Sequence, residues 1–303
     1  MKVVSVGDRV EAGAYRLHSR FKTVTNYRLE AGRPRPAVLC LVTPAVGSGP
    51  INVVVEGEFP EADSVVLESD VLMLDGRRSP LGPRYDSALP EGPPAPAMVE
   101  ALTRHLRAAA HPKSLAFLLD ESRAANFRPG FEQNMAKQIR DGARLLLGAD
   151  PAQGARLLRG CGFGLTPAGD DLLAGALIAS HLAGPTRHPE RGKGFPSPAP
   201  GSLWRSLAAL GMTGSSGTLL SDAFLALAAE GRVNEPVKQL LAALVGADTE
   251  AMPSCADRVL AHGETSGADI LTGLVLAVHK GFNFQQPTFN SQRPTGETHD
   301  GER

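Results

Sequence analysis

The chain has few cysteines, few aromatic residues and almost no net charge, and each scarcity excludes a class of protein. Its three cysteines, Cys40, Cys161 and Cys255, are odd in number and far apart, which argues for reduced thiols in a cytoplasm rather than a disulfide framework. A net charge of −1 leaves no basic excess for nucleic acid, and 5% aromatic residues are too few for base-stacking platforms. No apolar run is long enough for a membrane span, and the first residues lack a signal-peptide core. We therefore expect a cytoplasmic protein that binds neither nucleic acid nor membrane.

Familiar catalytic and nucleotide-binding signatures are also missing. The sequence contains no Walker motif, no G-x-S-x-G elbow, no H-E-x-x-H helix and no Cys/His spacing typical of zinc. The glycines that begin at Gly160 follow a helical pattern rather than a strand, which excludes a dinucleotide fingerprint. The sequence therefore does not support assignment to the common nucleotide-binding or hydrolase classes.

The spacing of apolar residues predicts two domains of different structure. Residues 1–80 contain strand-like runs rich in Val and Leu, separated by Gly, Pro and Asp breaks. Six prolines between Pro80 and Pro96 predict a linker over residues 81–96. From residue 97 to residue 284 the apolar residues recur every three or four positions, as in helices, and this pattern includes residues 112–124. The expected fold class is α+β, with an N-terminal β-rich domain followed by a larger all-helical domain.

Two polar segments interrupt or end the helical pattern. Residues 184–201 are rich in Pro, Gly and charged residues and predict an exposed loop. Residues 285–303 are polar without periodicity and predict a disordered tail. Between these breaks, Pro167–Leu182 is apolar on nearly every face, which predicts a central buried helix.

A glycine-rich stretch at residues 160–175, GCGFGLTPAGDDLLAG, carries the strongest functional signal. It holds four closely spaced glycines: Gly160, Gly162, Gly164 and Gly169. Thr166 followed by Pro167 predicts a helix N-cap with proline at the first helical position. Such a helix start has unpaired N–H groups that suit an anion, and Asp170 and Asp171 in its first turn are carboxylates that suit a cation. The combination predicts a ligand site.

Residues 263–273, GETSGADILTG, repeat this motif about a hundred residues later. With one gap, the following residues of the first copy and the second copy correspond: Thr166 and Thr265, Asp171 and Asp269, Leu173 and Leu271, Gly175 and Gly273. We expect the two helix N-termini to meet, so that Asp170, Asp171 and Asp269 converge on one pocket. The alternative interpretation is that each aspartate only complements the dipole of its own helix.

Several other polar groups are candidate site residues, and each also has a purely structural interpretation. A third Gly/Ser/Thr turn at residues 211–218 offers hydroxyls to an anion or simply an N-cap. His262 precedes the second motif and is a candidate general base or a satisfied helix C-terminal histidine. Arg156 and Arg159 precede the first motif and either reach an anion or face solvent. A polar group on a predicted strand, His18-Ser19-Arg20 with Asn26, is either functional or an ordinary surface face.

At these motifs the chain resembles the DUF2877 family, which includes the AllH-type subunit of oxamate carbamoyltransferase. The resemblance rests on GFGLTPAGDDLLAG, the Thr-x-Ser-Ser turn at residues 213–216 and HGETSGADILTG, with weaker support from LHSRFKTVTNYRL and GSGPINVVV. It covers about residues 10–280. Glu264-Thr265 departs from the His-Thr or His-Ser expected there, with His262 two positions earlier.

The resemblance implies a subunit of an enzyme of purine and allantoin catabolism. The implied reaction is phosphorolysis of oxalurate to oxamate and carbamoyl phosphate, which carbamate kinase then uses. The implied partners are the other carbamoyltransferase subunits, which are acyl-CoA-synthetase-like and DUF1116-like proteins, together with a small anionic substrate.

Together, the residues and the resemblance predict an anion or metal site at two helix N-termini. We expect Asp170, Asp171 and Asp269 to act in catalysis and to hold a Mg²⁺-type ion or the carbamoyl NH₂ group. The expected substrate- or phosphate-binding residues are Gly162, Gly164, Thr166, Gly169, Thr213, Ser215, Ser216, Thr265, Ser266 and Gly267. Two other interpretations stay open, a metal-dependent hydrolase on a helical scaffold and a non-catalytic scaffold subunit.

Overall fold

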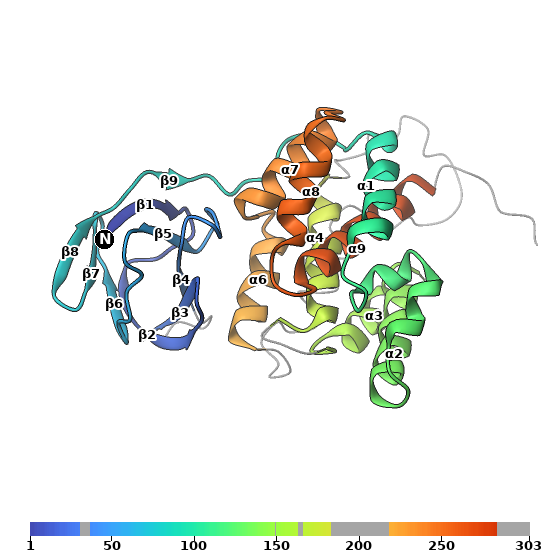
Figure 1. Ribbon diagram of the computed structural model, residues 1–303, viewed down its shortest axis with the longest axis horizontal. Coiled ribbons are helices and arrows are strands. Elements are labelled where there is room, and N and C mark those ends of the chain that lie inside the picture. Colours follow the sequence, from blue (N-terminus) through green and yellow to red (C-terminus); the bar gives the residue numbers. More distant parts are fainter. Residues whose placement is uncertain (31–36, 149, 163–165, 183–217, 284–303) are drawn as a thin grey trace, which may run out of the picture.

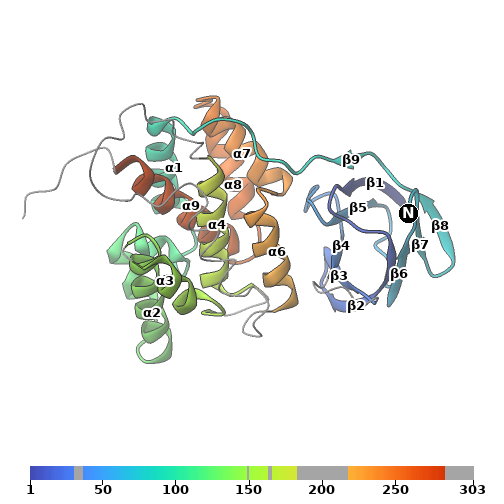
Figure 2. The same ribbon diagram turned by 180° about the vertical axis from the view of Figure 1, so that it is seen from behind.

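The computed structural model describes residues 1–30, 37–148, 150–162, 166–182 and 218–283. Within these residues a β-rich N-terminal part precedes a larger helical part, so the predicted α+β class is confirmed. The two parts lie side by side along the long axis of the molecule (Figures 1 and 2). The predicted loop at residues 184–201 and the predicted tail at residues 285–303 lie outside the described residues. Among those described, no helix combines the length and apolar character that a membrane span needs.

The described N-terminal residues form one curved, nine-stranded sheet in the order β8-β7-β6-β2-β3-β4-β5-β1-β9. The strands are β1 Lys2–Gly7, β2 Gly13–Arg20, β3 Val24–Leu29, β4 Val38–Val42, β5 Asn52–Glu56, β6 Ser64–Leu67, β7 Val71–Leu74, β8 Arg77–Pro80 and β9 Arg84–Tyr85. Neighbouring strands are antiparallel except for the pairs β4–β5 and β1–β9. Strands β2 and β3 form a hairpin within the predicted β-rich domain, and β9 lies within the predicted linker.

The sheet buries apolar side chains on both faces of its central strands. The concave face holds a core of alternating residues that includes Tyr15, Tyr27 and Leu39, all fully buried. On β4 and β5 the opposite face packs against helix α6 (Leu219–Ala229). Cys40 and Val42 contribute to this second contact. Because both faces are covered, β4 reads as a continuous apolar run instead of an alternating one.

The described helical part contains eight α-helices and two 3₁₀-helices. The α-helices are α1 Pro96–Ala109, α2 Phe131–Leu146, α3 Pro151–Leu158, α4 Ala168–Leu182, α6 Leu219–Ala229, α7 Glu235–Val245, α8 Ala251–Leu260 and α9 Ser266–Asn283. The helix expected over residues 112–124 is instead a pair of 3₁₀-helices, Leu115–Leu118 and Glu121–Asn126. Ser114 and Asp120 each cap one of them by accepting a backbone N–H, and this second start breaks the single helix.

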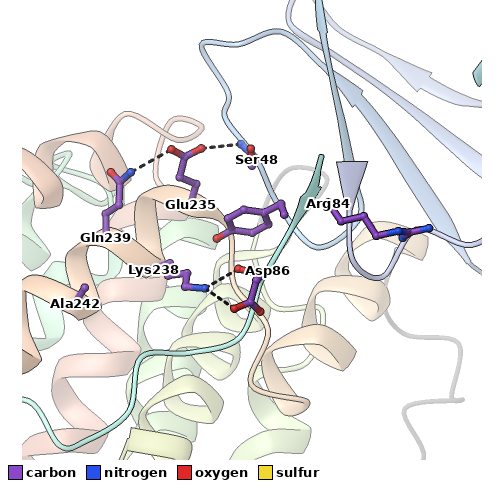
Figure 3. Close-up of a pocket in the computed structure, with 8 residues that line it drawn as sticks. Ser48, Arg84, Asp86, Glu235, Lys238, Gln239 and Ala242 are labelled. Atoms are coloured by element: carbon purple, nitrogen blue, oxygen red, sulfur yellow. Dashed lines mark hydrogen bonds and ion pairs between the residues drawn. The ribbon is translucent and has the colours of Figure 1, made fainter. Parts of the chain in front are cut away.

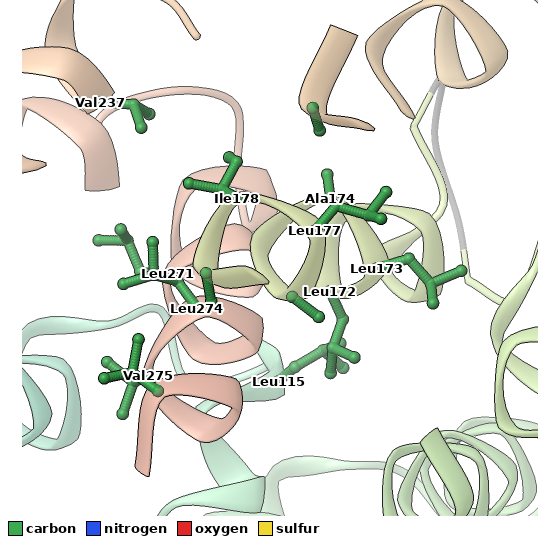
Figure 4. Packing of buried hydrophobic residues seen from close by; sticks show 14 of the residues in the cluster. Leu115, Leu172, Leu173, Ala174, Leu177, Ile178, Val237, Leu271, Leu274 and Val275 are labelled. Atoms are coloured by element: carbon green, nitrogen blue, oxygen red, sulfur yellow. The ribbon is translucent and has the colours of Figure 1, made fainter. Parts of the chain in front are cut away.

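Helix α4 lies at the centre of the helical part, as its uniformly apolar sequence predicts. Most of its residues are buried, from Gly169 to Ala179 and again at Leu182. Helix α9 packs along it, and both helices contribute to one buried core that includes Leu172, Leu271 and Leu274 (Figure 4). This contact between α4 and α9 is the most extensive between helices of the described chain.

The helical part contains two copies of the same three-helix arrangement. In the first copy α2 packs on α3, and α3 leads into α4; in the second α7 packs on α8, and α8 leads into α9. The sequence repeat lies at the same place in each copy, where the third helix begins. The repeat seen in the sequence is therefore part of a larger structural repeat.

The sheet and the helical part meet at α7, beside an open cavity of about 570 Å³ (Figure 3). Glu235 accepts the backbone N–H of Ser48 at 3.1 Å and also bonds to Gln239. Lys238 contacts Asp86 at 3.2 Å and lies over the ring of Tyr85. These lining side chains already bond to one another, so they join the two parts of the fold.

Candidate functional site

Two glycines let the backbones of α4 and α9 touch. A Cβ atom on Gly175 would lie 1.9 Å from the carbonyl oxygen of Ile270, and a Cβ atom on Gly273 would lie 2.1 Å from that of Leu172. The two contacts are reciprocal, since Gly175 corresponds to Gly273 and Leu172 to Ile270 in the repeat. The two helices are therefore related by an approximate two-fold axis at this crossing.

The N-terminal ends of the two helices meet, as predicted. The hydroxyl oxygens of Thr166 and Ser266, one from each motif, lie 3.0 Å apart and form a hydrogen bond. The glycine crossing at Gly175 and Gly273 lies about two turns further along each helix. Close backbone packing thus fixes the two motifs against each other and brings their acidic residues together.

Asp171 is buried at this junction, with only 6% of its surface exposed. Burial raises the pKa of its carboxyl well above the usual range, and the neighbouring charges of Asp269 and Asp170 raise this pKa further. Hydrogen bonding from the Ser266 and Thr166 hydroxyls opposes the shift. Its Oδ2 atom is buried without a hydrogen-bond partner in the described chain.

Asp269 is fully buried and occupies the corresponding position on α9. Its Oδ1 accepts the backbone N–H of Leu115 at 2.6 Å, while its Oδ2 has no hydrogen-bond partner among the described residues. Burial raises the pKa of Asp269 to about 7, although the Leu115 amide and the Thr265 hydroxyl pull it down. Both carboxyls therefore favour the protonated form more than an exposed aspartate does.

Asp170 differs from the other two aspartates, because both of its oxygens are bound within the protein. Oδ1 accepts the Gly160 N–H at 3.0 Å and lies 3.5 Å from Arg159, and Oδ2 accepts the hydroxyl of Ser221. Arg159 also pairs with Asp222 of α6 at 2.5 Å. Asp170 therefore anchors α6 and the end of α3 to α4, and only Asp171 and Asp269 keep free acceptor atoms.

The expected unpaired amides at the start of α4 are largely occupied. Gly169 donates its N–H to the Cys161 carbonyl at 2.8 Å, and both Asp170 and Asp171 donate to the Pro167 carbonyl. In the second motif, the Gly267 N–H donates to the His262 carbonyl at 3.1 Å. The carbonyls of Cys161, Pro167 and His262 thus take up N–H donors that an anion would need.

The glycines of the two motifs serve mainly to allow close packing. A Cβ atom on Gly169 would lie 2.1 Å from the Leu158 carbonyl oxygen, and one on Gly267 would lie 1.9 Å from that of Val259. Gly162 has a φ of 130°, which favours glycine. Among the other predicted ligand-binding residues, Gly164, Thr213, Ser215 and Ser216 lie outside the described residues.

In the described part of the chain, no group of three or more His, Cys, Asp or Glu side chains is arranged to hold a metal ion. Two of the three aspartates predicted as ligands offer free oxygen atoms, and the third is paired with Arg159. The expected Mg²⁺ ion therefore stays a prediction.

The remaining candidate residues form hydrogen bonds with other groups of the protein. His262 bonds to the carbonyls of Arg258 and Val46, as expected for a satisfied histidine at a helix end. Arg156 bonds to Gln153 on its own helix. Sequence reasoning missed Ser221, Asp222 and the Leu115 amide, because nothing in their local pattern indicates a partner that lies far away in the chain.

Residues 158–278, which include both motifs, match the family model described as oxamate carbamoyltransferase subunit AllH. No curated protein and no solved structure matches the chain. The matched segment runs from the end of α3 to α9 and contains Asp170, Asp171 and Asp269. Over residues 158–278, the chain is thus similar to the AllH-type family.

Proposed function

We propose that this chain is a subunit of a carbamoyltransferase of purine and allantoin catabolism, which converts oxalurate and phosphate to oxamate and carbamoyl phosphate. The family match supports the subunit assignment. One structural observation carries the site: Asp171 and Asp269, from two motifs about a hundred residues apart, are buried together, and each has an oxygen without a hydrogen-bond partner among the described residues.

The chemistry of these two oxygens suits a carbamoyl group. A carbamoyl NH₂ has two N–H donors, and the two carboxyl oxygens without partners match them in number. Buried acceptors without a partner are costly, so they favour a ligand that brings donors. The hydroxyls of Thr166 and Ser266 lie beside the pair and offer further hydrogen bonds.

We also propose that one carboxyl of the pair donates a proton during the reaction. During phosphorolysis a phosphate oxygen bonds to the carbamoyl carbon, the C–N bond to the oxamate nitrogen breaks, and that nitrogen takes up a proton. A carboxyl that is still protonated near neutral pH is suited to supply it. The raised pKa values of Asp171 and Asp269 support this general-acid role.

The rest of the enzyme is proposed to come from other subunits. We propose acyl-CoA-synthetase-like and DUF1116-like proteins as partners and a small anionic molecule as substrate. A requirement for Mg²⁺ is tested by measuring turnover after chelation and after readdition of the ion.

The test uses the reconstituted complex and measures carbamoyl phosphate formation from oxalurate. We expect Asp171→Asn and Asp269→Asn each to lower turnover by about 100-fold or more, because each removes an ionisable group from the pair. Asp257→Asn is the matched control, since Asp257 is exposed on α8 and bonds to His105. It should retain full activity.

The result that contradicts the proposal is wild-type turnover in both aspartate variants. A second contradicting result is loss of turnover that is explained by failed assembly, which size-exclusion chromatography of the complex detects. That outcome favours the scaffold interpretation, in which the glycine-packed helices only hold a partner.

A further inference from the structure

A polar trio on the sheet lies apart from the aspartate pair and takes no part in the function proposed above. It consists of His18 and Ser19 on β2 and Asn26 on β3. His18 is exposed, Ser19 is half-buried, and Asn26 is buried with 4% of its surface exposed. Each of the three side chains bonds to another of the three.

A β-bulge places the two consecutive residues of β2 on the same face. Leu17 pairs with Tyr27 and Ser19 with Asn26, so His18 is the extra residue between them. Without the bulge, His18 and Ser19 would point to opposite faces of the sheet. A bulge is a common means of re-aiming a side chain next to a functional site.

The face that carries the trio is the one directed toward the helical part. Asn26 pairs with Cys40 and lies two residues from Val24, and both of these belong to the cluster that packs against α6. Residues that pair across strands, or that lie two apart along one strand, share a face. The trio is therefore a polar group beside an otherwise apolar contact between sheet and helix.

The hydrogen bonds in the trio define an order of donors and acceptors. The Asn26 amide Nδ2 donates to Ser19 Oγ at 3.0 Å. The hydroxyl proton of Ser19 is then free to point at His18 Nδ1, which lies 3.1 Å from Oγ and accepts it when the ring proton is on Nε2. A serine hydroxyl within hydrogen-bond reach of an imidazole meets the first requirement for an activated nucleophile.

We propose that Ser19 is a nucleophile, with His18 as its base, toward acyl or carbamoyl compounds that carry a good leaving group. Ser19 Oγ forms a bond to the carbonyl carbon, and its proton passes to His18 Nδ1. The bond to the leaving group breaks, and the leaving group departs with that proton. Water then attacks the acyl-serine, His18 takes the water's proton and returns it to Ser19 Oγ, and the product is a carboxylic or carbamic acid.

The experiment treats the full chain, without partners, with a fluorophosphonate probe. Ser19 Oγ forms a bond to phosphorus, fluoride leaves, and the hydroxyl proton passes to His18. We expect one adduct by intact mass, located at Ser19 by peptide mapping and absent in Ser19→Ala. His18→Ala should slow labelling by about 100-fold or more, and added imidazole should restore it, because His18 is exposed and its removal leaves room for a free base.

Two sets of controls keep the outcome specific. Ser69→Ala should label at the wild-type rate, since Ser69 is an exposed serine whose partner is Asp70 and not a histidine. The probe reports on Ser19 in the full chain without partners, so a failure of the carbamoyltransferase proposal does not affect this test. No adduct, an adduct at another serine, or an unchanged rate in His18→Ala overturns the proposal, and circular dichroism verifies that each variant is folded.

Discussion

The glycine crossing of α4 and α9 allows a quantitative prediction for Gly175→Ala. The new Cβ atom would lie 1.9 Å from the Ile270 carbonyl oxygen and 2.7 Å from the Leu274 nitrogen, both in the backbone of the facing helix. Ordinary contact begins at 3.4 Å. No side-chain rotation relieves a clash with backbone, so the helices must separate by about 1.5 Å in an interior that is packed like a crystal.

The expected cost comes from two opposing effects. Overpacking of this kind costs about 1–3 kcal/mol, and more where backbone must move. Replacing a mid-helix glycine by alanine returns up to about 1 kcal/mol of helix propensity. We therefore expect Gly175→Ala to lower the free energy of unfolding by about 2 kcal/mol or more. Gly273→Ala should do the same, because its contact with Leu172 is the reciprocal one.

The assay is urea unfolding followed by circular dichroism at 222 nm. The double variant should cost clearly less than the sum of the two single changes, because the first substitution already separates the helices. Gly246→Ala is the control: this residue ends α7 with a φ of −75°, and its added Cβ would approach only the Ala242 oxygen, at 3.1 Å. A Gly175→Ala protein within 0.5 kcal/mol of wild type would refute the packing argument.

Two further predictions concern the buried charges. The pKa of Asp269 is about 7 in the folded chain and about 3.9 when unfolded, so the folded state binds the extra proton and stability should fall as pH rises from about 4 to 7. The free energy of unfolding should change by up to about 1.4 kcal/mol per pH unit. Asp269→Asn should reduce this pH dependence, which urea unfolding at several pH values measures. An unchanged pH dependence in the variant would argue against the raised pKa of Asp269. Arg159→Ala should cost about 3 kcal/mol by leaving Asp170 buried without its counter-charge. Adding Asp170→Asn should recover part of that loss, and no recovery would mean that Arg159 stabilises the fold in another way.

Local patterns were sufficient for much of the fold. The change from strand-like to helical spacing predicted the β-rich and helical parts, because side-chain period follows directly from backbone geometry. The uniform apolar character of residues 167–182 predicted the central helix α4 for the same reason. The prediction of one helix was wrong at residues 112–124. Asp120 caps a second short helix there, and the spacing of apolar residues contains no signal for that cap.

The acidic site also combines features that the sequence predicts with features that only the folded structure creates. Repetition of the Thr, Asp and Gly positions in the two motifs was enough to predict that Asp171 and Asp269 lie together. The sequence by itself located the two helix starts closely, because caps, glycines and apolar spacing act over a few residues; α4 begins at Ala168, one residue after the predicted Pro167. Only the tertiary structure decided that Asp170 is bound to Ser221 and Arg159 while Asp171 and Asp269 keep free oxygens. These partners come from other helices, and burial, which sets the carboxyl pKa values, exists only when the helices pack.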